Sequence, residues 1–379
     1  MERSLSERNA FIKELLIIRE QSTLSDSKKD YQHLKKIIWT NRILLLIGFS
    51  SAWLIPNPLS MIAISLALTG MWTIVAHHVL HGGYDAIAKI PKRYHSTVFA
   101  SGLRRYVDWP DWMYPPAWNY EHNILHHFYV NEALDPDQMS YRFAAIKPNS
   151  SRKKSKWKKI LKLIIKISFW KCSYYSFNTM KALAEKKAYQ QDADFKKYRK
   201  STYKHCIIPY ITYHFILIPL LFLPLGWQAS LFVLINRFGA ELITNWHTFF
   251  IIVSNHTGSD LALQAQHFST KEEFYMAQLS SSCNFNTGGF WRDYLHGYLN
   301  YQIEHHLFPN LPAAQYVRLQ PLVKSLCYKY QLSYIQEPVF TRARKLFDII
   351  LRKEVMQFNP TLSVEKNSQT KIESYESVY

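Results

Sequence analysis

Long apolar runs alternate with polar, basic segments along the 379 residues of this chain. Residues 37–55 and 59–76 form one pair of apolar runs, joined by a short turn at residues 56–58, and residues 205–225 and 228–253 form a second pair. Each run approaches the ~20 residues that a helix needs to cross a bilayer. The pattern predicts an all-α integral membrane protein, with four transmembrane helices in two hairpins and a cytosolic helical cap. Buried helices of a soluble protein are the alternative interpretation.

Three charged residues fall within these runs. Arg42 lies near the start of the first run, where its side chain can reach the membrane interface. Arg237 and Glu241 are four apart in the last run, so they can pair on one helix face that is turned towards protein. Neither turn between paired runs contains Lys or Arg, whereas the flanking segments are rich in both. The positive-inside rule then places the termini in the cytosol, in either a bacterial inner membrane or the endoplasmic reticulum.

Changes in composition divide the chain into six segments. These are a cytosolic N-terminal segment (1–36), a first hairpin (37–81), a cytosolic and interfacial segment (82–204), a second hairpin (205–254), a cytosolic cap (255–357) and a disordered tail (358–379). Within the third segment, residues 157–170 place apolar residues on one helix face and lysines on the other. Such a helix is expected to lie in the membrane interface, against anionic lipid.

Composition supports the membrane interpretation. The chain is 48% hydrophobic and carries a net charge of +18, which suits apolar segments in lipid and basic segments at an anionic surface. A basic chain can also bind nucleic acid, but the sequence has no nucleic-acid-binding motif, so no such partner is expected. The four cysteines are widely spaced and form no Cys-x-x-Cys pair, which indicates free thiols in a reducing compartment rather than disulfides or a zinc knuckle.

Half of the 16 histidines fall in three short clusters. The clusters are His77, His78 and His81; His122, His126 and His127; and His305 and His306, which follow Gln302. Residues four apart share a helix face, so His77 with His81, and His122 with His126, can each hold a metal from one side. Neutral imidazole ligands suit Fe, Zn or Cu rather than Ca or Mg. The clusters therefore predict a His-rich metal site in the cytosolic cap.

In these clusters the chain resembles the membrane fatty acid desaturases, which carry three histidine boxes. The pattern His-x3-His, His-x3-His-His and Gln-x2-His-His, with Gln-Ile-Glu-His-His-Leu-Phe-Pro at residues 302–309, is most similar to the front-end branch of that family. The resemblance implies a desaturase with two non-haem Fe ions and O2 as co-substrate, acting on a fatty acyl lipid. Because the chain lacks the His-Pro-Gly-Gly haem signature, a separate electron donor of the cytochrome b5 or ferredoxin type is expected.

The resemblance also implies a set of metal ligands. Carried over by position, they are His77, His81, His122, His126, His127, His305 and His306, with Gln302 at the variable first position of the third box. His77 and His78 both precede His81, so the first ligand stays open between them. A further ligand is expected at the end of the fourth span, where His256 is favoured over His247, which lies nine residues earlier.

Two points of chemistry remain open from sequence. Glu132, Asp135 and Asp137 follow the second box and either orient ligand histidines or belong to a solvated acidic loop.

Two other functions are compatible with the histidine clusters. One is a hydroxylase or ketolase of the same histidine-box superfamily, which would insert oxygen into a C–H bond. The other is a non-enzymatic membrane protein that binds Zn or Cu, which would place its ligands inside the spans, along a conduction path.

Overall fold

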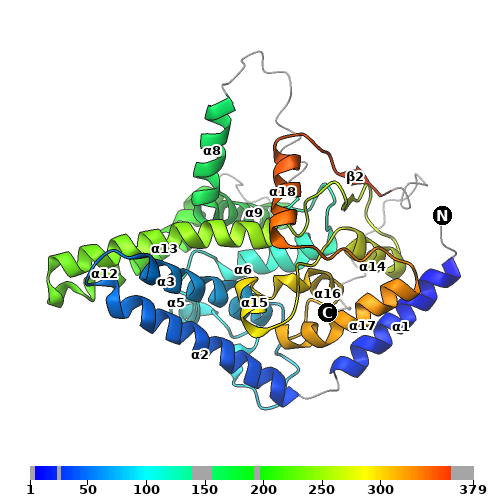
Figure 1. The fold of residues 1–379 in the computed structure, drawn as a ribbon, viewed down its shortest axis with the longest axis horizontal. Coiled ribbons are helices and arrows are strands. Elements are labelled where there is room, and N and C mark those ends of the chain that lie inside the picture. Colours follow the sequence, from blue (N-terminus) through cyan, green and yellow to red (C-terminus); the bar gives the residue numbers. More distant parts are fainter. Residues whose placement is uncertain (1–4, 24–26, 139–155, 192–196, 360–379) are drawn as a thin grey trace.

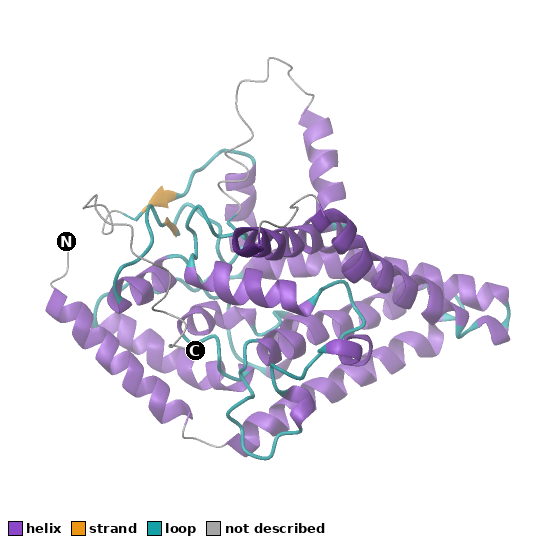
Figure 2. Cartoon of the chain, turned by 180° about the vertical axis from the view of Figure 1, so that it is seen from behind, coloured by secondary structure: helices purple, strands orange, loops and turns teal. Residues whose placement is uncertain are grey.

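The computed structural model describes residues 5–23, 27–138, 156–191 and 197–359. These residues are mostly helical, with one small sheet in which β1 (Ala262–Leu263) pairs in parallel with β2 (Gln357–Phe358). Figure 1 shows one set of helices packed side by side at one end of the molecule and the N-terminal helix, Leu5–Thr23, at the other. The same division is visible from behind in Figure 2.

The long helices come from the predicted apolar runs. They are α2 (Ser27–Ala52); α3 (Pro58–Gly70), which continues through η1 (Met71–Ala76) and α4 (His77–Leu80); a helix over Tyr198–Leu225; and α13 (Trp227–Val253). The helix over Tyr198–Leu225 comprises α10 (Tyr198–Thr202), η7 (Tyr203–Ile207), α11 (Ile208–Ile211), η8 (Thr212–Leu217), α12 (Ile218–Leu220) and η9 (Leu223–Leu225). Both hairpins are thus present, and α2 begins ten residues before the predicted first span.

The remaining elements surround the ends of these helices. In chain order they are α1 (Leu5–Thr23), η2 (Lys92–Tyr94), η3 (Gly102–Arg104), α5 (Arg105–Asp108), α6 (Pro115–Trp118), η4 (Asn119–His126), α8 (Lys156–Ser168), η5 (Lys171–Tyr175), α9 (Ser176–Gln191), α14 (Lys271–Ser280), α15 (Phe290–Leu295), η10 (Leu299–Tyr301), α16 (Gln302–Leu307), α17 (Ala313–Lys329) and α18 (Val339–Ile350). The predicted amphipathic helix is α8, which stands out from the body in Figure 1.

Small and polar side chains hold the long helices together. Asn57 caps α3, since its Oδ1 accepts from the Ser60 amide at 2.8 Å. Asn236 of α13 reaches this turn: its Oδ1 accepts from the Asn57 amide and its Nδ2 donates to the Ala52 carbonyl, both at 2.8 Å. Thr244 Oγ1 also lies 2.9 Å from Ser65 Oγ between α13 and α3. Such contacts are typical of helix packing in membranes, where burial of apolar surface adds little.

The four-span prediction is confirmed only in part. Within the described ranges, two helices are long and apolar enough to cross a membrane, namely Pro58–Leu80 and Tyr198–Leu225. The other two predicted spans lie in α2 and α13, which do not reach that standard. α2 carries Lys35 and Lys36 beside its apolar part, and α13 buries a row of polar residues that includes Asn236 and Arg237.

The charged pair of α13 faces protein, as predicted. Arg237 Nη1 lies 3.3 Å from Glu241 Oε2, and both side chains are buried. Lys171 of η5 approaches the other oxygen of Glu241 at 2.7 Å, and its own side chain is 1% exposed. This network ties η5 to α13. It offsets three charges that would be costly to bury singly.

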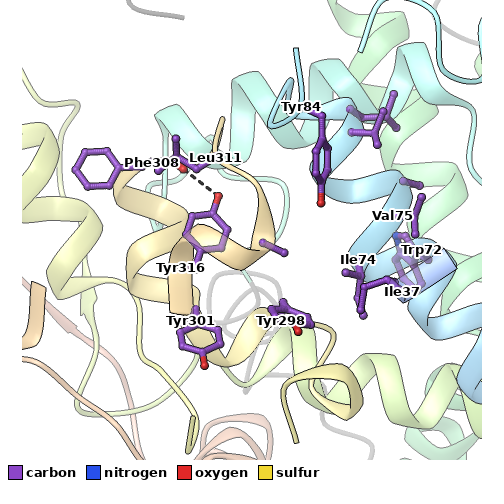
Figure 3. Close-up of a cluster of buried hydrophobic side chains, with 14 of the residues drawn as sticks. Ile37, Trp72, Ile74, Val75, Tyr84, Tyr298, Tyr301, Phe308, Leu311 and Tyr316 are labelled. Carbon is purple, nitrogen blue, oxygen red and sulfur yellow. Dashed lines mark hydrogen bonds between the residues drawn. The ribbon is translucent and has the colours of Figure 1, made fainter. Parts of the chain in front are cut away.

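A core of aromatic and aliphatic side chains lies between the helices and the third histidine box. Figure 3 shows Ile74 of the Pro58–Leu80 helix beside Tyr298, and Tyr316 beside Phe308 and Leu311 of the later chain. Tyr316 OH donates to the Phe308 carbonyl at 2.9 Å, the bond drawn in Figure 3. This packing fixes the end of the Pro58–Leu80 helix against the segment around α16.

Two smaller predictions can be compared with the structure. The four cysteines are free, as expected. The disordered tail was predicted from residue 358, but Phe358 belongs to β2 and the Asn359 amide donates to the Leu263 carbonyl at 2.8 Å. The rest of that predicted tail, residues 360–379, lies outside the described residues.

Candidate metal centre

The first histidine box lies at the end of the Pro58–Leu80 helix. The helix widens into a π-helical stretch at Met71–Ala76, a feature that often marks functional sites. The next turn is α-helical, and the His81 amide donates to the His77 carbonyl at 3.0 Å. This turn places the rings of His77 and His81 together, with their centroids 4.8 Å apart. His78 points elsewhere, and its Nδ1–H donates to the Ile74 carbonyl.

The second box lies on another π-helical stretch, η4, which follows the short helix α6. Pro115 at the start of α6 has the fixed φ that the first turn of a helix requires. The rings of His122 and His126 stack with their centroids 5.1 Å apart, so the four-residue spacing still brings them to one face. His127 follows on the neighbouring face, with its ring nearly perpendicular to that of His122.

The third box is placed by a tight turn and a buried cap. Gly297 and Tyr298 both have left-handed backbone, with φ of 64° and 58°, and they direct the chain into η10 and α16. Asn284 Oδ1 accepts from the Ile303 amide at 2.8 Å, and Asn284 Nδ2 donates to Glu304 at 2.8 Å. Burial raises the pKa of Glu304 to about 7. These contacts hold α16 so that its two histidines face the first two boxes.

Four histidines form a first group. One ring nitrogen from each of His77, His81, His122 and His305 lies within 4.8 Å of the others, and all four residues are buried. His77 Nε2 lies 3.0 Å from His305 Nε2. These four nitrogens come from three boxes that are distant in sequence.

A second group contains His126, His256 and His306, again with ring nitrogens within 4.8 Å. In each ring Nδ1 donates to an acceptor outside the group. The acceptors are Asp135 Oδ1 at 3.0 Å from His126, the Ser281 carbonyl at 3.0 Å from His256 and Gln278 Oε1 at 2.8 Å from His306. Because the acceptors carry no proton, each ring nitrogen must donate. In its neutral form each ring then presents the lone pair of Nε2, as metal-binding histidines commonly do.

His127 joins the two groups. Its ring centroid lies 4.7 Å from that of His81, 4.8 Å from that of His305 and 4.4 Å from that of His306. Eight imidazoles therefore meet in one buried cluster. A third overlapping group consists of His122, His126 and Asp137, whose ligand atoms also lie within 4.8 Å of one another.

Burial sets the charge of these rings. It lowers the pKa of His81, His122, His127, His305 and His306 well below the usual range, and that of His256 to about 3. These rings are therefore neutral at pH 7, the form in which imidazole binds a metal. His126 differs: burial lowers its pKa, but the Asp135 carboxylate outweighs this effect and the pKa is raised.

The ring nitrogens are arranged to bind a metal rather than to form hydrogen bonds with one another. Among the described residues, both nitrogens of His122 and of His127, and Nε2 of His81 and His306, are buried without a hydrogen-bond partner. Buried polar atoms are rarely left unpaired, because the desolvation cost is then not offset. Soft to intermediate ions such as Fe, Zn or Cu would satisfy these atoms.

The alternatives left open by the sequence can be compared with this geometry. His77 and His256 lie in the two groups. His78 lies in neither, and His247 Nε2 instead contacts the Leu295 carbonyl at 2.7 Å. Gln302 lies beside the second group, and its amide nitrogen is 2.8 Å from His256 Nε2. That amide and a metal would compete for the same lone pair.

Of the three acidic residues after the second box, Asp135 contacts His126 directly. Glu132 instead contacts His267, at 2.9 Å. Gln278, Asn284 and Tyr316 support the boxes but were not singled out from the sequence, because isolated amide and phenol side chains carry no recognisable spacing. Only their contacts in the folded chain identify them.

A small cavity lies beside the cluster. Its lining includes His77, His122, His126, His256 and Gln302, together with Asp137, Trp72, Trp118, Trp170, Tyr175, Ile252, Val253 and Leu299. Trp170 and Tyr175 stack at 5.4 Å and form part of the wall. The cavity is small, about 30 Å³, and its wall combines polar groups, including Asp137 and Gln302, with aromatic and aliphatic side chains.

The sequence that forms this site is similar to those of known proteins. Residues 34–338 match the family described as fatty acid desaturase. The chain is 42% identical over 80 residues to the fatty acid desaturase 2-like protein FADS2B of Mus musculus, 45% identical over 78 residues to fatty acid desaturase 3 of Homo sapiens, and 49% identical over 74 residues to fatty acid desaturase 3 of Bos taurus. These stretches cover 20–21% of this chain and 15–17% of the relatives. The family match includes all three boxes and His256, and the chain belongs to the fatty acid desaturase family.

Proposed function

We propose that this protein is a membrane acyl-lipid desaturase, which introduces a C=C double bond into a fatty acyl chain with O2 as co-substrate. The observation that carries the proposal is the convergence of eight buried imidazoles from four separate segments. They form two groups of ring nitrogens that His127 joins. Family membership supports the same activity.

In this proposal the first group would hold one non-haem iron ion and the second group another, and His127, whose ring contacts both groups, would be available to either ion. Such ions, when bound, supply the O2-derived oxidant that removal of two hydrogens from an unactivated methylene pair requires. The protein itself orients the rings through Asp135, Ser281 and Gln278. Trp170 and Tyr175 in the cavity wall would help to exclude water from the cluster.

The proposal includes a membrane topology and partners. All four apolar runs cross the membrane, the histidine boxes and both termini face the cytosol, and α8 lies at the interface. The substrate is a fatty acyl lipid from the surrounding membrane, and a separate cytochrome b5 or ferredoxin type of protein supplies two electrons. The positions of the histidines at helix ends and in the cap support this arrangement, because a metal-conducting protein would carry them along its spans.

The test is the fatty-acid profile of a host that expresses the protein, compared with hosts that express His306→Ala or His247→Ala at equal protein level. We expect a new unsaturated fatty acid with the wild type and with His247→Ala, and none with His306→Ala. Hydroxylated or keto products would instead indicate an oxygenase of the same superfamily. Identical profiles, even with longer acyl substrates and a supplied electron donor, would contradict the desaturase proposal.

A further inference from the structure

We propose that a cavity between the two helix hairpins binds one membrane phospholipid of net negative charge, with its phosphate at Arg42 and Arg93 and one acyl tail along the helices. This lipid is separate from the acyl chain that would react at the histidine cluster. The inference rests on the membrane topology proposed above, and it depends neither on the metal centre nor on the activity.

The cavity lies between helices of both hairpins. Its volume is about 550 Å³, within the range of about 300–1,000 Å³ that is typical of ligand sites. Its apolar wall includes Leu45 and Phe49 of α2, Leu68 of α3 and Phe222 of the Tyr198–Leu225 helix. The rings of Phe49 and Phe222 stack with their centroids 6.1 Å apart, so side chains of the two hairpins meet at this wall. An acyl tail fits such an apolar space.

This cavity is distinct from the small one beside the histidine cluster. None of the residues that line it belongs to the three histidine boxes. Met71 and Val75 of η1 line the larger cavity, whereas Trp72 lines the small one. The ring of Trp72 contacts that of Trp112 with centroids 5.0 Å apart, and both rings are buried. One helix therefore contributes different side chains to the two cavities, and a lipid in the larger one has no histidine ligand to contact.

The cavity opens at a surface that the proposed topology places in the membrane. Val107 and Leu221 both line it and are 79% and 76% exposed. Leu221 belongs to the second hairpin, and Val107 belongs to the segment between the hairpins, which is expected at the interface. Exposed apolar side chains around a cavity are typical of interaction sites. In a bilayer the molecules that surround this opening are lipids.

Two arginines without a counter-charge lie at the rim of the cavity. Among the described residues, neither Arg42 nor Arg93 forms an ion pair, and each guanidinium instead lies over an aromatic ring, that of Trp39 at 4.9 Å and that of Tyr94 at 4.8 Å. Burial raises the pKa of Tyr94, and both arginines oppose this effect, so both lie near the same phenol. Guanidinium groups bind phosphate oxygens through paired N–H donors. The two arginines are therefore suited to hold a lipid phosphate.

The other charged residues of the lining already have partners. Asp108 accepts from Nε and Nη2 of Arg104, both at 2.8 Å. Asp111 Oδ1 lies 3.9 Å from Lys171 Nζ. Arg237 also lines the cavity and belongs to the buried charge network of α13. The two arginines at the rim thus remain as uncompensated positive charge, which favours a lipid of net negative charge over a zwitterionic one.

Two buried donors in the lining also lack a partner. They are Nδ2 of Asn41 and Nε1 of Trp109, and both side chains are at most 2% exposed. Tyr294 OH donates to Asn41 Oδ1 at 2.5 Å, which leaves Nδ2 to donate to a ligand. An unpaired buried donor costs free energy, so an acceptor is expected in the cavity. The ester oxygens of a phospholipid supply acceptors next to the phosphate, whereas a hydrocarbon tail alone has none.

The test uses the full-length protein purified in detergent, with native mass spectrometry to count bound lipids during titration. The probes are phosphatidylglycerol and phosphatidylcholine with identical oleoyl chains. We expect the wild type to bind one phosphatidylglycerol per chain more tightly than phosphatidylcholine. The double variant Arg42→Gln/Arg93→Gln should bind phosphatidylglycerol at least about tenfold more weakly. The matched control is Arg344→Gln, which alters an exposed arginine of α18 outside this cavity and should bind as the wild type does.

A second variant, Leu68→Trp, fills the cavity and leaves both arginines in place. It should also lose the bound phosphatidylglycerol, and size-exclusion profiles of all variants show whether the fold is retained. Equal affinity of the wild type and the double arginine variant would overturn the inference. Loss of binding in the arginine variant with full binding in Leu68→Trp would place the lipid on the outer surface and would also overturn it.

Failure of this inference can be distinguished from failure of the proposed function. Binding of phosphatidylglycerol requires neither iron nor turnover, so a host without new unsaturated fatty acids would leave the binding result unaffected. Conversely, a desaturase that binds the two lipids equally would contradict only the lipid site. A wild type that stays soluble without detergent would contradict the proposed topology and this inference together.

Discussion

Asp135 Oδ1 lies 3.0 Å from Nδ1 of His126, and both side chains are at most 2% exposed. The other oxygen of Asp135 accepts from the Asn131 amide at 2.8 Å, so the carboxylate is anchored to its own loop. The contact turns Nε2 of His126 towards His256 and His306. An acidic residue after the second box thus determines the geometry of the second group.

Asp135→Asn should therefore weaken binding of the second metal ion. Loss of an outer-shell carboxylate typically costs about 10–100-fold in metal affinity. Competition titrations of the purified protein against a chelator measure this change, with Glu132→Gln as the matched control. Equal affinities for Asp135→Asn and the wild type would show that the contact does not support the site.

Replacing each of the two histidines near the end of α13 should affect the iron content differently. His256→Ala deletes a member of the second group and should lower the iron content from two ions towards one per chain. His247→Ala removes only a contact with the Leu295 carbonyl and should leave the iron content unchanged, at a stability cost of about 1 kcal/mol. Metal analysis of both variants, purified in parallel, tests the assignment. Loss of iron in His247→Ala alone would reverse it.

The turn before the third box should not tolerate a side chain. A Cβ at Gly297 would clash with Thr73 Oγ1, and the backbone there has φ of +64°. Gly297→Ala should lower the thermal unfolding temperature and the iron content together, because the turn aligns α16. Gly288→Ala is the control, since Gly288 also has positive φ but its Cβ would meet nothing within 4 Å. If both variants lost thermal stability and iron to a similar extent, backbone strain alone would explain the effect.

The buried charge network should contribute to stability rather than to metal binding. Glu241→Gln leaves Lys171 and Arg237 without their shared carboxylate, and breaking a buried pair in this way typically costs about 3–5 kcal/mol. The exposed pair Lys181–Glu185 gives the comparison, because Glu185→Gln should cost under about 1 kcal/mol. Thermal unfolding in detergent distinguishes the two. A small effect of Glu241→Gln would mean that water or other groups replace the carboxylate.

The histidine boxes could be predicted from sequence because helical spacing is local. His77 with His81, and His122 with His126, meet as the four-residue spacing requires, even though the second pair lies in a π-helical stretch. The long apolar runs likewise predicted both hairpins. The pairing of Arg237 with Glu241 followed from the same spacing rule.

Other features depend on contacts between distant segments. The sequence left the further metal ligand open between His247 and His256, because the answer depends on where α13 ends relative to α16. Gln278 contacts His306 from 28 residues away, and Asn284 caps α16 from 19 residues away. The sequence also predicted four spans where two helices are long and apolar enough, since α2 and α13 mix apolar runs with charged or buried polar residues.

If this chain holds two iron ions and uses them to form a double bond, one round of the reaction can be followed without a protein electron donor, in a single-turnover experiment. Purified, iron-loaded protein is reduced chemically without oxygen, exposed to O2 with acyl lipids from the expression host, and its products are analysed with its iron content. We expect two iron ions per chain and about one new C=C bond per chain in the wild type, with neither in His306→Ala. A fully iron-loaded wild type that yields hydroxylated product, or no product from any acyl lipid supplied, would contradict it.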